Sequence, residues 1–242
     1  PPRSTLFPYT TLFRSGGQYF LYFGVLGIFL PYFNLYCFHL GFSGVEIGAL
    51  SGLRSLAMIL FPVAWGAVAD RYQARRPIFI LCNFAAAAVW ALYLLHRDFT
   101  AMFWVTLAYG IFFAPIISFM EAFTMDLLGG EKKRYGRIRA WGTSAFIAVV
   151  IGMGRLIDAT SVEIIVVLIL AGSLLQAVFS VMVPGTRRRR GAAGGVDRGF
   201  LIRPKPLLFL GSAFLMLVSH GAYYGFFSIH LERSEEHTSE LQ

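Results

Sequence analysis

Two ionisable residues of opposite charge stand in apolar stretches of this chain at matched distances from a turn signal. Glu121 and Arg139 each lie nine residues from Gly130, on opposite sides of it. A chain reversal near Gly130 would bring two antiparallel helices level at these positions. A lone charge at membrane depth costs about 2.5 to 3.5 kcal/mol on insertion scales. The sequence therefore predicts that the two side chains face each other and pair.

Two further polar groups lie in apolar surroundings. Arg54 stands about 12 Å into its apolar run, at 1.5 Å per residue, which is too deep for its charge to reach the surface easily. It either faces a cavity, where it could hold a substrate carboxylate bidentately, or forms a structural pair. His220, with Tyr223 and Tyr224 one turn on, either serves proton-linked or substrate binding, or makes an interhelical hydrogen bond.

The composition indicates that membrane-spanning apolar segments position these charged and polar groups. Of the 242 residues, 57% are hydrophobic and only 14% are charged, against about a quarter charged in soluble domains. The apolar residues come in runs of about 20, the length that crosses a bilayer core. The net charge of +8 does not indicate nucleic-acid binding, because the basic residues lie between the apolar runs. Cys37 and Cys82 fall inside runs, which favours core packing over a disulfide.

Seven membrane-spanning helices are expected in an all-α membrane protein. Their approximate spans are 17–39, 46–68, 78–95, 100–127, 138–158, 163–183 and 207–230. Loops after the second, fourth and sixth spans carry nearly all loop Lys and Arg, and the alternate loops carry only Arg97. By the positive-inside rule, the natural amino terminus is cytoplasmic. We expect bends at Pro31, Pro62 and Pro115, and close helix approaches at small residues, namely Gly24, Gly27, Gly48, Ser51 and Gly52.

The chain divides into five segments on this interpretation. Residues 1–15 and 233–242 match in-frame translations of two sequencing adapters, so we expect artefacts with few tertiary contacts there. Residues 16–183 form a six-helix transmembrane bundle, and 184–206 a basic cytoplasmic linker that contains the run Arg187 to Arg190. Residues 207–232 form the seventh helix, which we expect to dock loosely.

The segment after the second span reads Gly66-Ala-Val-Ala-Asp70-Arg71-Tyr-Gln-Ala-Arg75-Arg76. It resembles the loop signature of the major facilitator superfamily, at the place where that family carries it. Gly66 would permit tight helix crossing, Asp70 could cap a helix start, and the arginines could pair with acids at helix ends. Ala74 stands where the family usually has glycine, which suggests a less tight turn.

A narrower resemblance links the chain to the lactose permease and its relatives. It rests on Glu121-Ala-Phe and on the motif Tyr135-Gly-Arg-Ile-Arg139-Ala-Trp-Gly142. The family's essential glutamate and arginine map onto Glu121 and Arg139 with the same separation, and its sugar-stacking aromatic maps onto Phe146. The segment from Ser219 to His230 is most similar to the phenylpropionate permease branch.

The remaining charged groups have structural interpretations. Asp126 lies five residues after Glu121, which turns it about 140° away, so we expect a bridge to Arg71 or Arg75. Arg155 and Asp158 would form a local pair. On the fifth span, Arg139, Thr143 and Phe146 share a face, while Arg137 is turned about 200° from Arg139 and suits a headgroup contact.

The resemblance implies a secondary active transporter and not an enzyme. We expect proton-coupled symport of a small organic solute by alternating access between two six-helix bundles, of which this chain holds the first plus one helix. Protonation of Glu121 would free Arg139 for the cargo; alternatively the pair only stabilises the hairpin. An aromatic carboxylate is favoured, and the alternatives are a sugar or nucleoside symporter, a non-transporting scaffold or an inactive fragment. We expect no cofactor, metal or nucleic acid, a bacterial-type inner-membrane location, and a monomer when full length.

Overall fold

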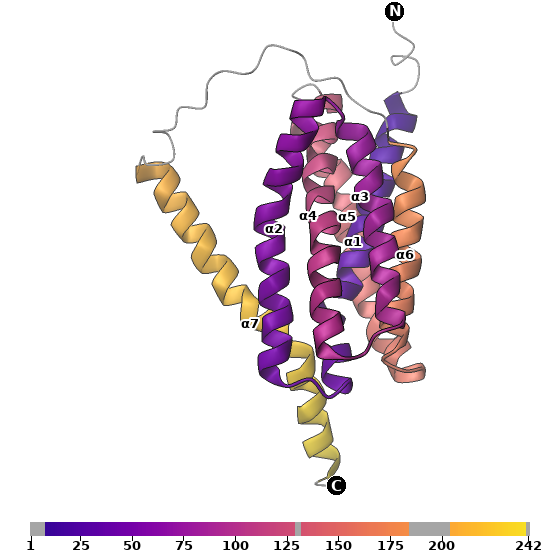
Figure 1. Ribbon diagram of the computed structural model, residues 1–242, viewed down its shortest axis with the longest axis vertical. Helices are drawn as coiled ribbons and strands as arrows, with labels where there is room; N and C mark the ends of the chain where they lie inside the picture. The colour runs from indigo at the N-terminus through magenta and orange to yellow at the C-terminus, as the bar shows by residue number, and fades with distance from the viewer. Residues whose placement is uncertain (1–7, 129–131, 184–203, 241–242) are drawn as a thin grey trace, which may run out of the picture. The chain divides into compact units, whose positions relative to one another are not determined.

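The computed structural model describes residues 8–128, 132–183 and 204–240, and every regular element in them is a helix (Figure 1). The expected all-α fold is therefore confirmed. Gly130, most of the expected linker and the outermost parts of both expected adapter segments lie outside the described residues. The elements are α1 (Pro8–His39), α2 (Gly44–Tyr72), α3 (Arg75–Trp90), η2 (Ala91–Leu94), α4 (Phe99–Leu128), α5 (Lys132–Ala159), α6 (Ile164–Ser180) and α7 (Pro204–Glu240).

Five helical stretches are long and apolar enough to cross a membrane. Shorter apolar helices cover Ile164–Ser180 and Pro204–Met216. Each of these seven overlaps one of the spans expected from hydropathy, because a bilayer core of about 30 Å sets a minimum length that the sequence reveals. The five long stretches are Arg14–His39, Gly44–Tyr72, Arg75–Leu94, Phe99–Leu128 and Tyr135–Ala159.

The chain consists of two compact units, Pro1–Thr186 and Arg187–Gln242. The first contains α1 to α6, and the second contains α7, a helix of 37 residues that starts at Pro204. Proline suits a first helical turn, where its missing N–H has no partner to lose. The loose docking expected for the seventh helix stays a prediction.

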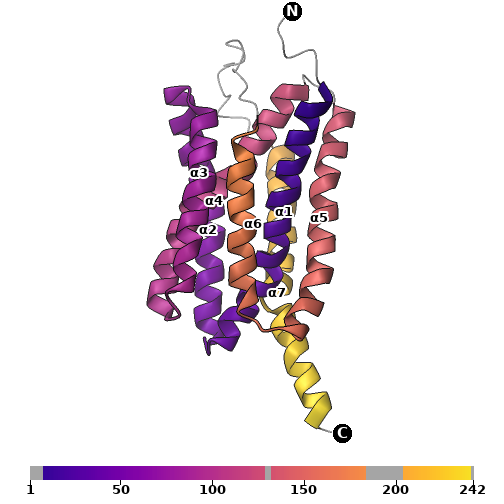
Figure 2. The ribbon, with the colours of Figure 1, turned by 90° about the vertical axis from the view of Figure 1, so that its right-hand side faces the viewer.

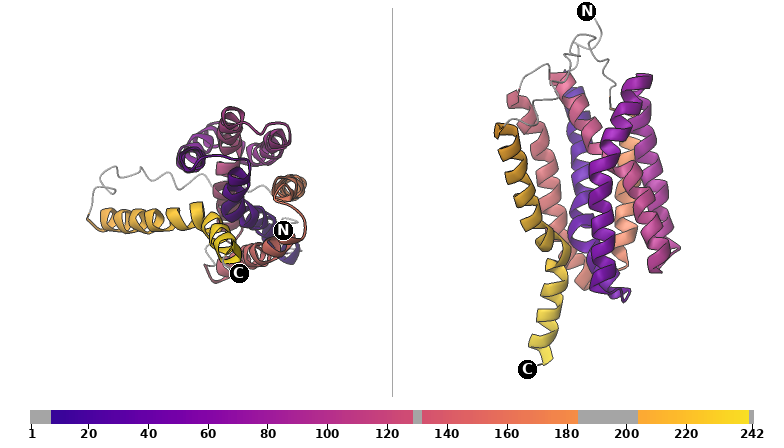
Figure 3. Two further views of the ribbon diagram at one scale, coloured as in Figure 1. Left: turned by 90° about the horizontal axis from the view of Figure 1, so that it is seen from below. Right: turned by 60° about the vertical axis from the view of Figure 1, so that its left-hand side comes forward.

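Helices α1 to α6 run side by side along one direction (Figure 2). α1 packs mainly against α5 and α6, and α4 packs mainly against α2 and α3. α3 and α6 join these two groups of three, which Figure 3 shows end-on. Exchanging α1 with α4, α2 with α5 and α3 with α6 leaves this list of contacts unchanged. The bundle is thus built from two corresponding halves, α1 to α3 and α4 to α6.

Aromatic rings fill the centre of the bundle. Phe29 of α1 lies edge-on to Trp90 of α3, with ring centroids 5.3 Å apart, and Trp90 lies 4.9 Å from Tyr109 of α4. The Trp90 indole N–H donates to the carbonyl oxygen of Val166 on α6 at 3.0 Å. Aromatic pairs in these geometries add to the energy of burial. Four helices are therefore joined around one indole ring.

A buried amide cluster joins α1, α3 and α6. The Nε2 atoms of Gln18 and Gln176 both donate to Oδ1 of Asn83, at 3.4 and 2.8 Å. Buried polar groups need such partners, because in an apolar interior water cannot supply them. Cys37 and Cys82 are buried and free, which confirms their assignment to core packing.

Pro115 in α4 lacks an N–H, so the carbonyl of Ile111, four residues earlier, loses its helical donor. The indole Nε1 of Trp65 on α2 donates to this oxygen at 2.9 Å. A neighbouring helix therefore satisfies the carbonyl that proline leaves free, which is how membrane helices tolerate proline. The bond also fixes α2 against α4.

The expected close approaches at small residues are only partly present. A Cβ atom on Gly27 would lie 3.1 Å from the carbonyl oxygen of Phe146, so α1 and α5 approach closely there. The same atom on Gly48 or Gly52 would meet nothing within 4 Å of the described chain. Among the described residues no helix approaches these two positions, because small residues permit an approach without specifying a partner.

Candidate functional site

Glu121 of α4 and Arg139 of α5 form an ion pair. The Nη1 atom of Arg139 donates to Oε1 of Glu121 at 2.6 Å. Their side chains are 41% and 42% exposed, so the pair is open on one side rather than sealed in the core. The predicted pairing across the α4–α5 hairpin is confirmed, although few other contacts join these two helices.

Tyr135 and Phe23 complete the surroundings of the pair. The hydroxyl of Tyr135, one turn before Arg139 on α5, accepts from Nη1 of Arg139 at 3.2 Å and donates to Oε1 of Glu121 at 3.3 Å. The guanidinium carbon of Arg139 lies 5.5 Å from the centroid of the Phe23 ring on α1. Sequence reasoning assigned no role to Tyr135, although its spacing of four from Arg139 placed both on one helix face.

Arg54 lies on α2, ten residues after Gly44, and thus about 15 Å along the helix. Its guanidinium carbon is 4.9 Å from the centroid of the Phe29 ring, a cation–π contact. In the described part of the chain, no acidic side chain forms an ion pair with it within 4.0 Å. The alternative of a structural pair is therefore not seen there.

Phe146 lies at the contact of α5 with α1. It is partly buried, and its backbone and ring stand against Gly27. Thr143, on the same face of α5, is exposed. The side chains of His220 and Tyr223 lie outside the described residues, so their roles stay predictions.

The turn between α2 and α3 carries an ion-pair network. Arg75 donates to Oδ1 of Asp70 through Nη2 at 2.7 Å and through Nε at 3.0 Å. Its Nη1 lies 3.8 Å from Oδ2 of Asp126 on α4, which confirms the expected structural bridge. Arg71 is exposed, with its guanidinium carbon 6.0 Å from the centroid of the Tyr72 ring. The expected local pair of Arg155 and Asp158 is not formed within 4.0 Å between these two described residues.

Arg76 contacts backbone rather than an acid. Its Nε donates to the carbonyl oxygen of Val183 at 3.0 Å and its Nη2 to that of Val181 at 2.8 Å. These carbonyls follow α6, where helix-end oxygens lack helical donors and a cation is favoured. The expectation that the arginines pair with acids was therefore incomplete.

Two expectations about this turn concern Gly66 and Ala74. A Cβ atom on Gly66 would meet nothing within 4 Å, so the described bundle has no tight crossing there. The turn itself takes a left-handed conformation at Gln73, with φ 51°, and Ala74 has an ordinary φ of −116°. The departure from glycine at Ala74 therefore leaves the turn unstrained at that residue.

Known proteins resemble this chain over most of its length. A family model described as the MFS_1 like family matches residues 12–241. The "Probable 3-phenylpropionic acid transporter" of Escherichia coli (strain K12) is 26% identical over 88% of this chain and 57% of its own length. The "Maltose permease" of Geobacillus stearothermophilus is 26% identical over 92% of this chain and 56% of its own. The chain spans about half the length of these relatives.

A solved structure shares the fold. The structure titled "Crystal structure of nucleoside transporter NupG" has a TM-score of 0.68 and 21% identity, and the match covers 83% of this chain and 52% of that one. At this identity the likeness is one of fold. The family match and the membrane-length helices indicate a multi-pass membrane protein of a transporter family, whose members are not enzymes. The chain belongs to the major facilitator superfamily of membrane transporters.

Proposed function

We propose that the whole protein is a proton-coupled symporter for a small organic solute and that Glu121 and Arg139 couple the proton to the cargo. The observation that carries this proposal is their 2.6 Å ion pair, held between two helices and open on one side. In a membrane protein, paired ionisable groups at depth are typical of proton relays and substrate pathways. A scaffold that moves no solute needs no such pair.

The coupling step is a change of partner at Arg139. When a proton from solution adds to the Glu121 carboxylate, that group becomes neutral and its attraction for the guanidinium falls. The planar Arg139 fork, still oriented by Tyr135 at 3.2 Å, can then hold an anionic or hydroxylated cargo bidentately. Release of the cargo restores the pair and expels the proton. One proton and one solute therefore move together.

Arg54 favours an aromatic carboxylate as the cargo. It supplies a cation beside the Phe29 ring, and no acidic side chain in the described residues neutralises it. A carboxylate could pair with this guanidinium while an aromatic ring packs against the surrounding rings. The relative named as a 3-phenylpropionic acid transporter supports this class.

A sugar or a nucleoside is the second candidate cargo. The relatives include proteins named "Maltose permease" and "Putative nucleoside transporter YegT", and the structural neighbour is titled a nucleoside transporter. Phe146 stands against α1 at Gly27, which supports packing more than stacking on a sugar. Competition of labelled uptake by an aromatic acid, a nucleoside and maltose would separate the three classes.

The proposed setting is the inner membrane of a bacterium. The positive-inside rule assigns the cytoplasm to the end of the bundle that bears the basic loops. We call it the basic end, and it holds the α2–α3 turn, with Arg71, Arg75 and Arg76, and the start of α5. His220 and Tyr223 would contribute from the second bundle, and the complete protein would be a monomer.

The test replaces Glu121 by Gln in the full-length protein, reconstituted in proteoliposomes. We expect Glu121→Gln to abolish stimulation of uptake by an inward proton gradient, because the amide cannot take up the proton. Exchange of cargo without a gradient should persist, because this step needs no net proton transfer. Glu163→Gln, at an exposed position before α6, is the matched control and should transport normally. Gradient-driven uptake by Glu121→Gln at the normal rate and equal protein level would disprove the coupling role.

A further inference from the structure

An apolar groove lies on the side of α1, α5 and α6, and none of the residues that line it belongs to the candidate transport site. It has a volume of about 480 Å³, which is within the range of small-molecule sites. Among the described residues, those that line it are apolar or glycine, apart from the indole N–H of Trp141. The members that matter here are Gly16 and Gly17 of α1, Trp141 of α5, and Leu175, Val178 and Phe179 of α6.

Two adjacent glycines shape the floor of the groove. A Cβ atom on Gly17 would lie 2.6 Å from the Phe179 ring, a distance that real atoms do not tolerate. A Cβ atom on Gly16 would lie 3.4 Å from the Trp141 ring. The absence of side chains on α1 therefore lets rings from α5 and α6 close over it. The groove is a consequence of helix packing rather than of a missing loop.

The groove faces away from the Glu121–Arg139 pair. Trp141 lies two residues after Arg139 on α5, which turns it about 200° around the helix. Trp141, Leu175 and Val178 are 58%, 60% and 62% exposed. In a membrane protein, exposed apolar side chains on such a face meet lipid rather than water. The solvent of this groove is therefore the acyl region of the bilayer.

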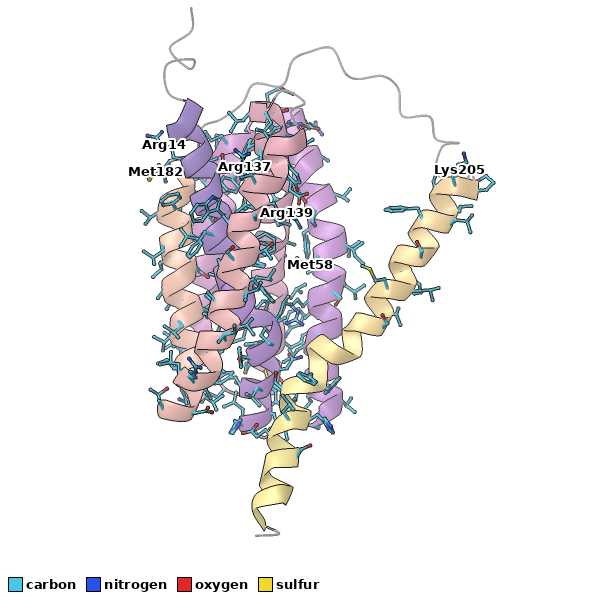
Figure 4. The ribbon with its side chains drawn as sticks, turned by 180° about the vertical axis from the view of Figure 1, so that it is seen from behind. Arg14, Met58, Arg137, Arg139, Met182 and Lys205 are labelled. Carbon is cyan, nitrogen blue, oxygen red and sulfur yellow. The ribbon has the colours of Figure 1, made fainter. Side chains whose placement is uncertain are left out.

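A cation stands above the groove on the same face of α5. Arg137 precedes Trp141 by four residues, one helical turn or about 6 Å nearer the basic end. It is exposed, and in the described chain no acidic side chain pairs with it within 4.0 Å. Figure 4 shows Arg137 near that end of α5, with Arg139 further along the helix. Arg137 is therefore one turn nearer the lipid headgroups than the groove is, and its long side chain can extend toward a phosphate there.

We propose that this groove is a binding site for an anionic phospholipid of the surrounding leaflet. One acyl chain lies in the groove between Trp141 and Val178, over the glycine floor, and the headgroup phosphate pairs with Arg137. A zwitterionic lipid could fill the groove equally well, but its ammonium group would offset the attraction. The charge at the rim therefore selects the headgroup, and the apolar lining holds the tail.

The experiment uses fluorescence quenching of Trp141 by brominated acyl chains. The chain is placed in phosphatidylcholine nanodiscs that contain an equal small fraction of brominated phosphatidylglycerol or brominated phosphatidylcholine. The signal of Trp141 is the difference between the protein and its Trp141→Phe variant. Arg14, at the same end of α1 (Figure 4), falls in the expected adapter segment, so every protein compared carries Arg14→Gln.

We expect the phosphatidylglycerol to quench Trp141 with about fivefold higher apparent affinity, the effect of one basic residue near an anionic surface. Arg137→Gln should remove this preference. Arg155→Gln, an exposed cation at the other end of α5, should keep it. Val178→Phe should fill the groove and reduce quenching by both lipids. Circular dichroism and elution volume verify that each variant is folded.

Four results would overturn the proposal. Equal quenching by both lipids would mean that the groove takes bulk lipid without headgroup selection. A preference that survives Arg137→Gln, or quenching that survives Val178→Phe, would place the lipid elsewhere. No quenching by either lipid would mean that protein, such as a second copy of the chain, covers Trp141.

Discussion

Arg54 and Arg139 occupy corresponding helices in the two halves of the bundle and differ in what surrounds their charge. α2 packs on α4 as α5 packs on α1. Each guanidinium lies over a phenylalanine of α1, Arg54 over Phe29 and Arg139 over Phe23. Arg139, however, has a carboxylate at 2.6 Å, whereas Arg54 has none within 4.0 Å among the described residues. A paired cation binds an anion only once its partner is neutralised, and an unpaired one binds at any time.

The largest expected effect tests this difference directly. In the full-length protein, Arg54→Gln should weaken the binding of an aromatic carboxylate by about ten- to a hundredfold, because a hydrogen bond to a charged group contributes about 1.5 to 3 kcal/mol. Stimulation by the proton gradient should remain, since Glu121 and Arg139 are intact. Competition assays at several pH values measure both quantities. An equal loss for the acid and for its neutral amide would show that Arg54 is structural.

A smaller effect concerns two hydrogen bonds, one that joins α2 to α4 and one that joins α5 to α1. The loss of each bond should change the stability of the bundle by a different amount. Trp65 of α2 donates to the carbonyl of Ile111, which Pro115 leaves without a helical donor, while Tyr32 of α1 donates to the carbonyl of Val150 at 2.8 Å. Val150 is followed by continuous helix, so its carbonyl keeps a second donor. Trp65→Phe should therefore cost about 1 to 2 kcal/mol in the free energy of unfolding, and Tyr32→Phe about 0.5 kcal/mol.

The same substitution made in a Pro115→Ala background tests whether the unpaired carbonyl of Ile111 causes the loss of stability in Trp65→Phe. Alanine restores the N–H to Ile111, so Trp65→Phe should cost much less in that background than in the parent chain. Unfolding by denaturant in detergent micelles measures all four proteins. A cost that is the same in both backgrounds would assign the loss to the volume of the indole ring instead.

The smallest effect concerns the turn after α2. Gln73 takes the left-handed conformation, which costs a residue with a side chain about 1 kcal/mol relative to glycine. Gln73→Gly relieves this strain but loses the bond from Nε2 of Gln73 to the carbonyl of Asp70, at 2.6 Å. We expect a net stabilisation of about 0.5 kcal/mol or less in the same unfolding assay. Ala74→Gly, one residue on at a negative φ, is the matched control and should not stabilise.

The helices and two of the ion pairs could be predicted because strong physical constraints act on them, whereas the expected pair of Arg155 and Asp158 is not formed between these described residues. A bilayer sets the length of each apolar run, and charges at depth need partners, so Glu121 and Arg139 pair and Asp126 reaches Arg75. The matched distances from Gly130 gave the register of the hairpin. These features depend on composition and spacing alone.

The remaining features depend on which surfaces meet, and spacing does not reveal that. The hydrogen bond from Trp65 to a backbone carbonyl joins two neutral groups, so a hydropathy profile does not reveal it. Gly48, Gly52 and Gly66 fit the small-residue pattern, yet the described chain approaches none of them. Arg76 caps α6 through backbone oxygens, which any sequence could supply. The groove beneath Trp141 likewise exists only once three helices are assembled.

The bonds of Arg76 also set an order of events during synthesis. Its carbonyl partner Val183 lies 107 residues later in the chain. At about 5 to 20 residues per second, the ribosome needs roughly 5 to 20 s to add that length. For this interval Arg76 must rely on water or on lipid phosphates at the membrane surface. Once α6 and the residues after it have been synthesised, Arg76 can bind their carbonyl oxygens. The α2–α3 turn is therefore held in place only when all six helices of the bundle are complete.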